Sequence, residues 1–410
     1  MDLKTIRAIL HDLSYSRTGG SEEELRAAEY LRDRCEALGA QTRLESFEVP
    51  MGEVRSASLT ADGRKIPCRG YRLAGSGTVE APFLYLPNTD AASIAAAKGH
   101  VVLLDTGVSY FVYQDLLSAG ALGYITYDGN VHTPDRDIDQ KELRPYVSLG
   151  KKLPGVNINA KDAFELVRRN TRSVRIELEG EERPGHSQNV VAELPGEGDE
   201  WIVLTAHYDS TPLSRGAYDN LSGCIGLLEI LEIMAKKGPA RRGLRFVFCG
   251  SEERGLLGSK AYVRQHETEL EKIVLNVNLD MIGSVMGKFI ACCSSETALV
   301  DYLRYMGAEL SFGIAPRQGV YSSDSTPFAD QGVPAVSFAR IAPPSQATIH
   351  NRYDTAAVLS PERLRSDGQF LTEFTRRMAA AAVCPVKREI PEKVRTELDE
   401  YLSRRRKKNG

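Results

Sequence analysis

The stretch Trp201-Ile202-Val203-Leu204-Thr205-Ala206-His207-Tyr208-Asp209 decides the fold of this 410-residue chain. Its first six residues are almost continuously apolar, which is typical of a strand buried on both faces of a sheet. A histidine and an aspartate follow where the strand ends. Helical segments separate this strand from similar ones, so the pattern predicts an α/β fold with a mostly parallel central sheet.

The alternation of strands and helices continues through the second half of the chain. Apolar runs predict strands at 244–249, 273–279 and 334–338. Apolar residues at helical spacing predict helices at 221–236, 258–265, 297–310 and 361–382. Nearer the start, Ser21 and Glu24 form a capping box and Gly39 is a stop signal, which predicts a helix over 21–39.

The segment 51–182 differs in character from its flanks. Its short strand-like runs, such as 83–86 and 123–126, are separated by Gly, Asp and Asn turns. No histidine or acidic pair in it stands out as a metal site. We therefore expect a β-rich domain at 51–182, inserted into a discontinuous domain made of 1–50 and 183–385.

Residues 386–410 form a charged C-terminal tail, in which Val394 and Leu398 belong to one apolar stripe. The run Arg404-Arg405-Arg406-Lys407-Lys408 is basic. Cations near the end of a helix complement its dipole, and chain ends are usually solvated. We therefore expect a solvated end rather than a surface for anionic partners.

The composition narrows the class of partner. A net charge of −3 and a pI of about 6.2 give no electrostatic reason to expect nucleic acid. No apolar run approaches the roughly 20 residues of a membrane-spanning helix, so no membrane is expected either. The seven cysteines include no CxxC pair. Reduced thiols, together with an N-terminus that lacks a signal-peptide pattern, predict a cytoplasmic protein.

Histidines and acids gather where the expected strands end. In an open α/β sheet, the loops at the carboxyl ends of the strands line the functional crevice. Two histidines and several carboxylates are therefore predicted to converge on one rim. These are His207, Asp209, Asp219, Glu252, Glu253, Asp280 and His350.

A cluster of this kind indicates that the protein binds metal ions. Burying several carboxylates together is costly unless cations neutralise them. Mixed imidazole and carboxylate ligands suit Zn²⁺, with Co²⁺ or Mn²⁺ as alternatives. The set exceeds what one catalytic zinc ion uses, whereas two ions about 3.5–4 Å apart that share a bridging carboxylate use it naturally.

Five sequence blocks, in this order, closely resemble the co-catalytic zinc aminopeptidases. That family includes bacterial leucyl aminopeptidases, aminopeptidase Y and glutamate carboxypeptidase II. The blocks are His207-x-Asp209, Asp219-Asn220, Glu252-Glu253-x-Gly255-Leu256-x-Gly258-Ser259, Asn278-x-Asp280-Met281 and His350-x-x-x-Asp354-Thr355. The resemblance covers roughly 1–50 and 183–385 and implies a three-layer αβα zinc-exopeptidase fold.

The resemblance also implies a role for each metal ligand. Asp219 bridges the two ions. His207 and Asp280 complete one site, and Glu253 and His350 complete the other. The expected activity is hydrolysis of the N-terminal peptide bond of peptide substrates.

Two further residues receive roles from the resemblance. Glu252 is the general base that moves a proton from the attacking water to the leaving amine. Asp209 is the carboxylate that orients His207. A tyrosine stabilises the tetrahedral intermediate in relatives, and Tyr321 is a candidate for that role, but ordinary packing is the preferred interpretation. Ser325 stands where relatives often have a histidine, so substrate contacts can differ.

The segment 51–182 looks like the protease-associated insert of aminopeptidase Y and its relatives. Lys98-Gly99-His100-Val101-Val102-Leu103-Leu104-Asp105 and the stretch 116–124 carry that likeness. Such an insert would shape substrate access.

Three other functions remain open from the sequence. A carboxypeptidase or dipeptidase would use the same centre, and Arg317, Arg340 or Arg352 could then bind a carboxylate. A glutaminyl-cyclase-like acyltransferase would use one zinc and interrupt the stretch after Glu253, which is continuous here. A binding protein such as the transferrin receptor would have lost ligands, and none is lost. The sequence leaves the oligomeric state open.

Overall fold

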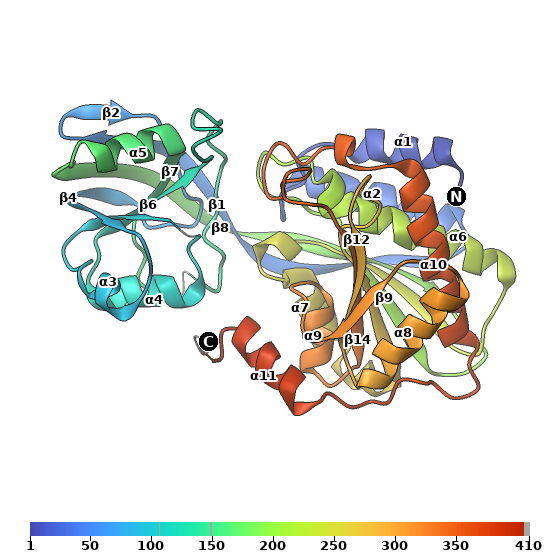
Figure 1. Cartoon of the computed structure of the whole chain (residues 1–410). Coiled ribbons are helices and arrows are strands. Elements are labelled where there is room, and N and C mark those ends of the chain that lie inside the picture. The colour runs from blue at the N-terminus through green and yellow to red at the C-terminus, as the bar shows by residue number, and fades with distance from the viewer. Residues whose placement is uncertain (106, 148–149, 406–410) are drawn as a thin grey trace. The chain divides into compact units, whose positions relative to one another are not determined.

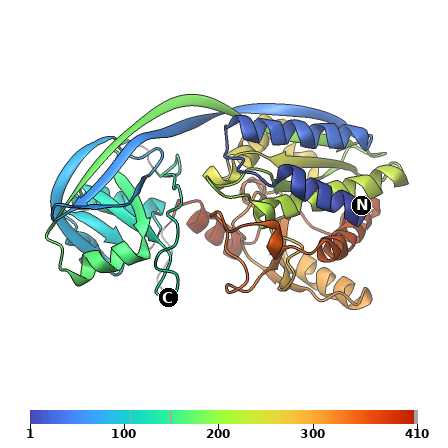
Figure 2. The same ribbon diagram turned by 90° about the horizontal axis from the view of Figure 1, so that it is seen from above.

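The computed structural model describes residues 1–105, 107–147 and 150–405, which form two compact units. The main unit combines Met1–Val49 with the chain from His186 onward, and the inserted unit is Pro50–Gly185. The chain passes between them within two long strands, β1 (Gln41–Ala61) and β8 (Ser173–Leu194) (Figure 2).

The sheet of the main unit runs in the order β13-β12-β14-β11-β9-β10-β8. Its central strands β14, β11, β9 and β10 are mutually parallel, whereas β12 and β8 run antiparallel to their central neighbours. The prediction of a mostly parallel sheet is confirmed. The strand bounds are β9 (Trp201–His207), β10 (Gly243–Cys249), β11 (Ile273–Leu279), β12 (Lys288–Ser294), β13 (Ala315–Gln318) and β14 (Ala335–Ile341).

Helices cover both faces of this sheet, which gives three layers (Figure 1). Alternate residues of β9 show why, since Ile202 and Leu204 pack into one buried cluster and Val203 into another. The first cluster is covered by α1 (Leu3–Leu13), α2 (Glu22–Ala37), α6 (Ser222–Lys237), α8 (Thr297–Glu309) and α10 (Pro361–Ala380). The opposite face carries α7 (Leu257–Gln265), α9 (Ser325–Asp330) and α11 (Glu392–Tyr401).

The helix predicted at 21–39 is present as α2, but its start differs from a capping box. The Ser21 hydroxyl accepts from the Glu24 N–H at 3.1 Å. The Glu24 carboxylate does not return to Ser21. It is fully buried and accepts from the N–H groups of Gly20 at 2.6 Å and Ser251 at 2.8 Å. Glu24 therefore links α2 to the segment that follows β10.

Part of the expected C-terminal tail is folded. Residues 392–401 form α11, which buries Val394 and Leu398. Arg404 pairs with Asp330 of α9, with nitrogen–oxygen distances of 2.6 and 2.8 Å. The apolar stripe expected in this segment therefore covers a surface of the main unit, while Arg404, the first residue of the basic run, keeps about half of its side chain exposed. Arg406-Lys407-Lys408 lie outside the described residues.

The inserted unit has its own core, and its strands pair in the order β8-β4-β5-β6-β7-β3, with β1 paired to β8 and β2 paired to β1. Strands β4 to β7 are parallel to one another. Its other elements are β2 (Arg64–Ile66), β3 (Arg69–Gly70), β4 (Gly77–Leu86), α3 (Ala91–Ala95), β5 (Val101–Leu104), α4 (Tyr110–Ala119), β6 (Gly123–Asp128), β7 (Gly155–Asn159) and α5 (Ala160–Arg168). Among the described residues of either unit, no helix is long and apolar enough to span a membrane.

Candidate metal centre

The register of the parallel strands brings the predicted residues to one edge of the main sheet. His207 is the last residue of β9 and pairs with Cys249, the last residue of β10. Glu252 and Glu253 follow β10 in a short 3₁₀ turn, Glu252–Arg254. Asp280 follows β11, whose neighbour is again β9.

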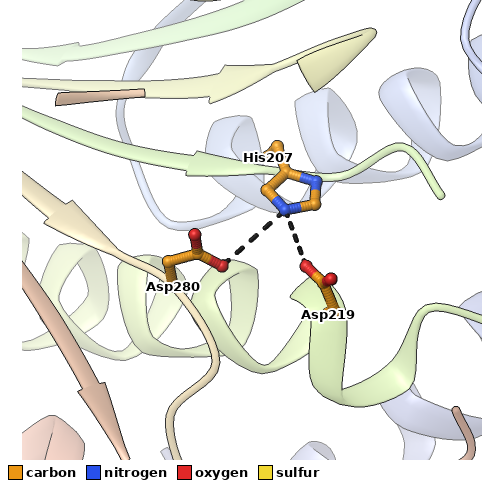
Figure 3. A group of neighbouring side chains, drawn as sticks. All are labelled: His207, Asp219 and Asp280. Carbon is orange, nitrogen blue, oxygen red and sulfur yellow. Dashed lines mark hydrogen bonds and ion pairs between the residues drawn. The ribbon is translucent and has the colours of Figure 1, made fainter. Parts of the chain in front are cut away.

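These side chains form two groups with the composition of metal sites. One group is His207, Asp219 and Asp280, and the other is Asp219, Glu253 and His350. Within each group the possible ligand atoms lie within 4.8 Å of one another. Figure 3 shows the first group, in which both acids point at the same ring nitrogen of the histidine. His207 Nε2 lies 3.0 Å from Asp219 Oδ1 and 3.7 Å from Asp280 Oδ1.

Asp219 belongs to both groups and offers a different oxygen to each. Its Oδ1 faces His207, and its Oδ2 lies 3.1 Å from Nε2 of His350. The same His350 nitrogen is 3.1 Å from Glu253 Oε2. One carboxylate thus stands between two clusters of ligand atoms.

Two side chains, those of Asp354 and Asn220, hold Asp219 in this position. The Asp219–Asn220 peptide bond is cis, within the turn Ala217–Leu221 that precedes α6. The Asp354 carboxylate accepts from the N–H groups of Tyr218 at 2.8 Å and Asp219 at 3.0 Å. The Asn220 amide donates to the Leu279 carbonyl at 2.9 Å and accepts from the Met281 N–H at 3.0 Å. Asp219 is therefore fixed to both the His350 loop and the end of β11.

Asp209 connects His207 with the glutamate pair. It is fully buried, and its Oδ1 lies 3.3 Å from His207 Nδ1. The same carboxylate accepts from the N–H groups of Glu252 at 2.9 Å and Glu253 at 3.2 Å. It can therefore fix the histidine ring and the start of the 3₁₀ turn at once, as carboxylates behind metal-binding histidines do.

The sequence analysis did not identify Arg17, a buried residue that also holds the site in place. Its guanidinium donates to the carbonyls of Tyr208 at 2.7 Å, Arg215 at 2.7 Å and Gly216 at 3.0 Å. Arg17 thus fixes the loop that follows β9. A single arginine in a Gly- and Ser-rich stretch has no local pattern that distinguishes it from a solvated one.

The electrostatics of the centre favour a cation. Burial raises the pKa of Glu253 to about 8, and it also raises the pKa values of Glu252 and Asp280. Burial alone lowers the pKa of His207, but the charge of Glu252 and the contacts with Asp209, Asp219 and Asp280 outweigh it and raise that pKa. Each shift has the direction expected where negative charge is crowded in a buried place.

The donor set fits divalent metal ions. Among the described residues, Asp280 Oδ1 is buried and makes no hydrogen bond. A buried carboxylate oxygen without a hydrogen-bond partner costs free energy unless it binds a cation. Imidazole and carboxylate donors together are typical of zinc and similar ions.

Arg340 and Tyr321 were also named from the sequence as residues that could contact the substrate. Arg340 is buried and occupied, because Asp367 accepts from it at 2.5 to 3.2 Å and the Gly287 carbonyl at 3.1 Å. It is therefore not free to bind a substrate carboxylate. For Tyr321, burial raises the pKa, and the charges of Asp280 and Asp219 add to that shift.

The comparisons with known proteins agree with this picture. The model of peptidase family M28 matches residues 189–375. Aminopeptidase YwaD of Bacillus subtilis is 26% identical over 377 residues, which cover 87% of this chain and 80% of the relative. Leucine aminopeptidase 2 of Trichophyton rubrum is 27% identical over 66% of this chain, and this chain spans only 55% of that relative.

A solved structure extends the likeness to the fold. A zinc aminopeptidase from Bacillus subtilis, BSAP, superposes with a TM-score of 0.78 at 24% identity, covering 96% of this chain and 98% of that one. The chain is a peptide hydrolase with a three-layer α/β main unit. Its residues 189–375 match the model of peptidase family M28.

Proposed function

We propose that the protein is a metal-dependent aminopeptidase that binds two divalent metal ions, with Zn²⁺ as the expected metal and Co²⁺ or Mn²⁺ as alternatives. The observation that carries the proposal is Asp219, whose two oxygens face two separate groups of ligand atoms at 3.0 and 3.1 Å. His207 and Asp280 would complete one site, and Glu253 and His350 the other. The names of the relatives, aminopeptidase and zinc aminopeptidase, point the same way.

The ions would supply a polarised scissile carbonyl and a water molecule of lowered pKa. The chain supplies the proton transfer. Glu252 Oε2 lies 3.9 Å from His207 Nε2, beside the ligand atoms and not among either group. From there its carboxylate can take a proton from the attacking water and give it to the leaving amine.

Two further groups assist this step. Asp209 holds the His207 ring and the backbone of Glu252 and Glu253 in fixed relative positions. The Tyr321 hydroxyl can donate a hydrogen bond to the carbonyl oxygen as it becomes negative, which is the purpose of preorganised donors in acyl transfer.

Cleavage at the N-terminal end is favoured by the names of the relatives, and one of the three arginines that a carboxypeptidase could use is already occupied. A carboxypeptidase needs a cation for the substrate's free carboxylate, and Arg340 is already bound to Asp367. We also propose that Pro50–Gly185 is a protease-associated insert, because it is a compact unit with strands and turns in the expected range.

A cytoplasmic location is supported by seven cysteines that are all free thiols.

A cleavage panel tests the proposal. Peptides with free or acetylated N-termini and with free or amidated C-termini are incubated with the protein and added zinc, cobalt or manganese. We expect cleavage of every peptide with a free N-terminus, whether amidated or not. Cleavage of acetylated but not amidated peptides would instead establish a carboxypeptidase, and cyclisation of an N-terminal glutamine without cleavage would establish an acyltransferase.

A further inference from the structure

The C-terminal helix α11 contacts the residue on each side of Tyr321, through the backbone of Val320 and the side chain of Ser322. Glu397 Oε2 accepts a hydrogen bond from the Val320 N–H at 3.0 Å. The Tyr401 hydroxyl lies 2.8 Å from the Ser322 hydroxyl, and the two share a hydrogen bond. Glu397 and Tyr401 are four residues apart on one helix, so they project from the same face. They therefore bracket Tyr321.

The contact of Glu397 with the Tyr321 segment depends on a close approach at Gly319. A side chain there would begin 2.9 Å from Glu397 Oε2 and 2.7 Å from the Arg317 guanidinium. The φ angle of Gly319 is +147°, which favours glycine. The chain thus passes close to the Glu397 carboxylate at a position whose backbone angle favours glycine.

The other side of the Tyr321 peptide is also held. The Tyr321 carbonyl accepts from the Thr326 hydroxyl at 3.1 Å and from the Ser323 hydroxyl at 3.3 Å. The backbone of Val320, the carbonyl of Tyr321 and the side chain of Ser322 therefore each have a hydrogen-bond partner. This is the kind of support that fixes a side chain within the tolerance a reaction needs.

Helix α11 is itself docked on the main unit. Val394 and Leu398 are buried against Ala329 of α9 and Ala335 of β14, and Val320 packs on the same cluster. The helix therefore joins the Tyr321 segment to the sheet that carries the metal centre.

We propose that Glu397 and Tyr401 are positioning residues, which hold Tyr321 so that its hydroxyl can donate to the substrate carbonyl oxygen as that oxygen becomes negative. The inference rests on the proposed aminopeptidase function. The C-terminal helix would then contribute to turnover indirectly, by holding a residue more than 70 positions earlier in the chain. The contacts of the helix given above are with Val320, Ser322 and the cluster around Ala329 and Ala335, so we expect metal binding to persist when they are removed.

The test is a kinetic comparison on the full chain with leucine 4-nitroanilide as the probe. In the Glu397→Ala/Tyr401→Phe variant we expect kcat to fall about 10- to 100-fold, because a displacement of about 1 Å at a reacting group can cost about 100-fold. KM and metal content stay unchanged. Glu397→Gln restores most of the rate, because its amide oxygen still accepts from Val320.

A double-mutant cycle separates positioning from general damage. In a Tyr321→Phe background, Glu397→Ala/Tyr401→Phe should lower kcat no further. Arg404→Ala is the matched control, because it removes a contact of the same C-terminal segment with α9 and leaves Val320 and Ser322 untouched. It should keep the wild-type kcat.

Three results would overturn the inference while the wild-type protein is active. They are an unchanged kcat in the double variant, an equal further loss in the Tyr321→Phe background, and a loss of bound metal in parallel with activity. If the double variant does not fold, Tyr401→Phe alone, which removes one oxygen and keeps the ring, replaces it in the same cycle. A wild-type protein that releases no N-terminal residue would instead contradict the proposed function.

Discussion

Both units of this chain contain parallel strands whose carboxyl ends carry polar side chains, but the two edges differ in chemistry. In the main unit, the strand ends bring together buried histidines and carboxylates around Asp219. In the inserted unit, Asp105 follows β5 and is exposed, and its two oxygens accept from the hydroxyls of Tyr85 at 2.6 Å and Tyr127 at 2.7 Å.

The difference shows what a parallel sheet contributes and what it does not. Topology places a crevice at the carboxyl ends of the strands in either unit. Chemistry depends on which side chains occupy it and on whether they are satisfied. The tyrosine hydroxyls already satisfy Asp105, whereas Asp280 Oδ1 in the main unit has no hydrogen-bond partner among the described residues.

The largest effect should come from removing the shared carboxylate. Asp219→Asn removes the negative charge that both groups of ligands share, so we expect loss of bound metal and a fall in activity of at least about 10³-fold. Elemental analysis and peptide cleavage measure it. Asp105→Asn, the corresponding strand-end carboxylate in the inserted unit, should change neither, and a loss of metal in that variant would contradict the contrast.

Glu252→Gln tests the proton transfer separately from metal binding. The amide keeps the shape and removes the base, so kcat should fall about 10²- to 10⁴-fold while the metal content stays at the wild-type level. In the inserted unit, Asp128→Asn alters an acid at the end of β6 and should leave kcat unchanged. Full activity in Glu252→Gln would exclude it as the base.

Stability should also depend on where a charge lies. Asp367 of the main unit is fully buried and pairs with Arg340 at 2.5 Å, so Asp367→Ala should destabilise the protein by about 3–5 kcal/mol, since an unpaired charge is left inside. In the inserted unit, Arg175 and Glu177 pair at 2.6 Å with about half of each side chain exposed. Glu177→Ala should leave the denaturant midpoint unchanged. Equal effects of the two substitutions would contradict this distinction.

The smallest predicted effect concerns Glu24 and pH. Burial, reinforced by the charge of Asp209, raises the pKa of Glu24 from 4.5 to about 8. A carboxyl with a raised pKa stabilises the fold fully at low pH and loses that contribution as the pH rises through about 8. Wild-type stability should therefore decline between pH 6 and pH 8, by at most about 1.4 kcal/mol for each pH unit.

Glu24→Gln removes this titration. Its thermal midpoint relative to wild type should rise as the pH increases from 6 to 8, which scanning calorimetry can measure. Glu80→Gln, an exposed control in the inserted unit, should follow the wild-type profile. A constant difference between Glu24→Gln and wild type would show that Glu24 does not titrate in this range.

The central sheet could be predicted from the sequence because strands buried on both faces consist of nearly continuous apolar residues. The sequence placed His207, Glu253 and Asp280 correctly at one edge because parallel strands end together. The inserted unit, Pro50–Gly185, begins and ends close to the expected 51–182. These features follow from local pattern and from one topological rule.

What the sequence did not predict depends on contacts between distant segments. Glu24 and Arg17 support loops more than 180 residues later in the chain, and neither has a local signal. Helix α11 carried an apolar stripe, but only the folded α9 and β14 show what that stripe covers. The metal roles of the five ligands stay a prediction.

The most direct test of the central claim is the number of metal ions bound by the wild-type chain. The protein is purified without chelators, equilibrated with zinc, freed of excess metal, and measured by elemental analysis against protein concentration. Two groups of ligands that share Asp219 predict two ions per chain. Fewer than one ion per chain would contradict the proposed centre and the mechanism built on it.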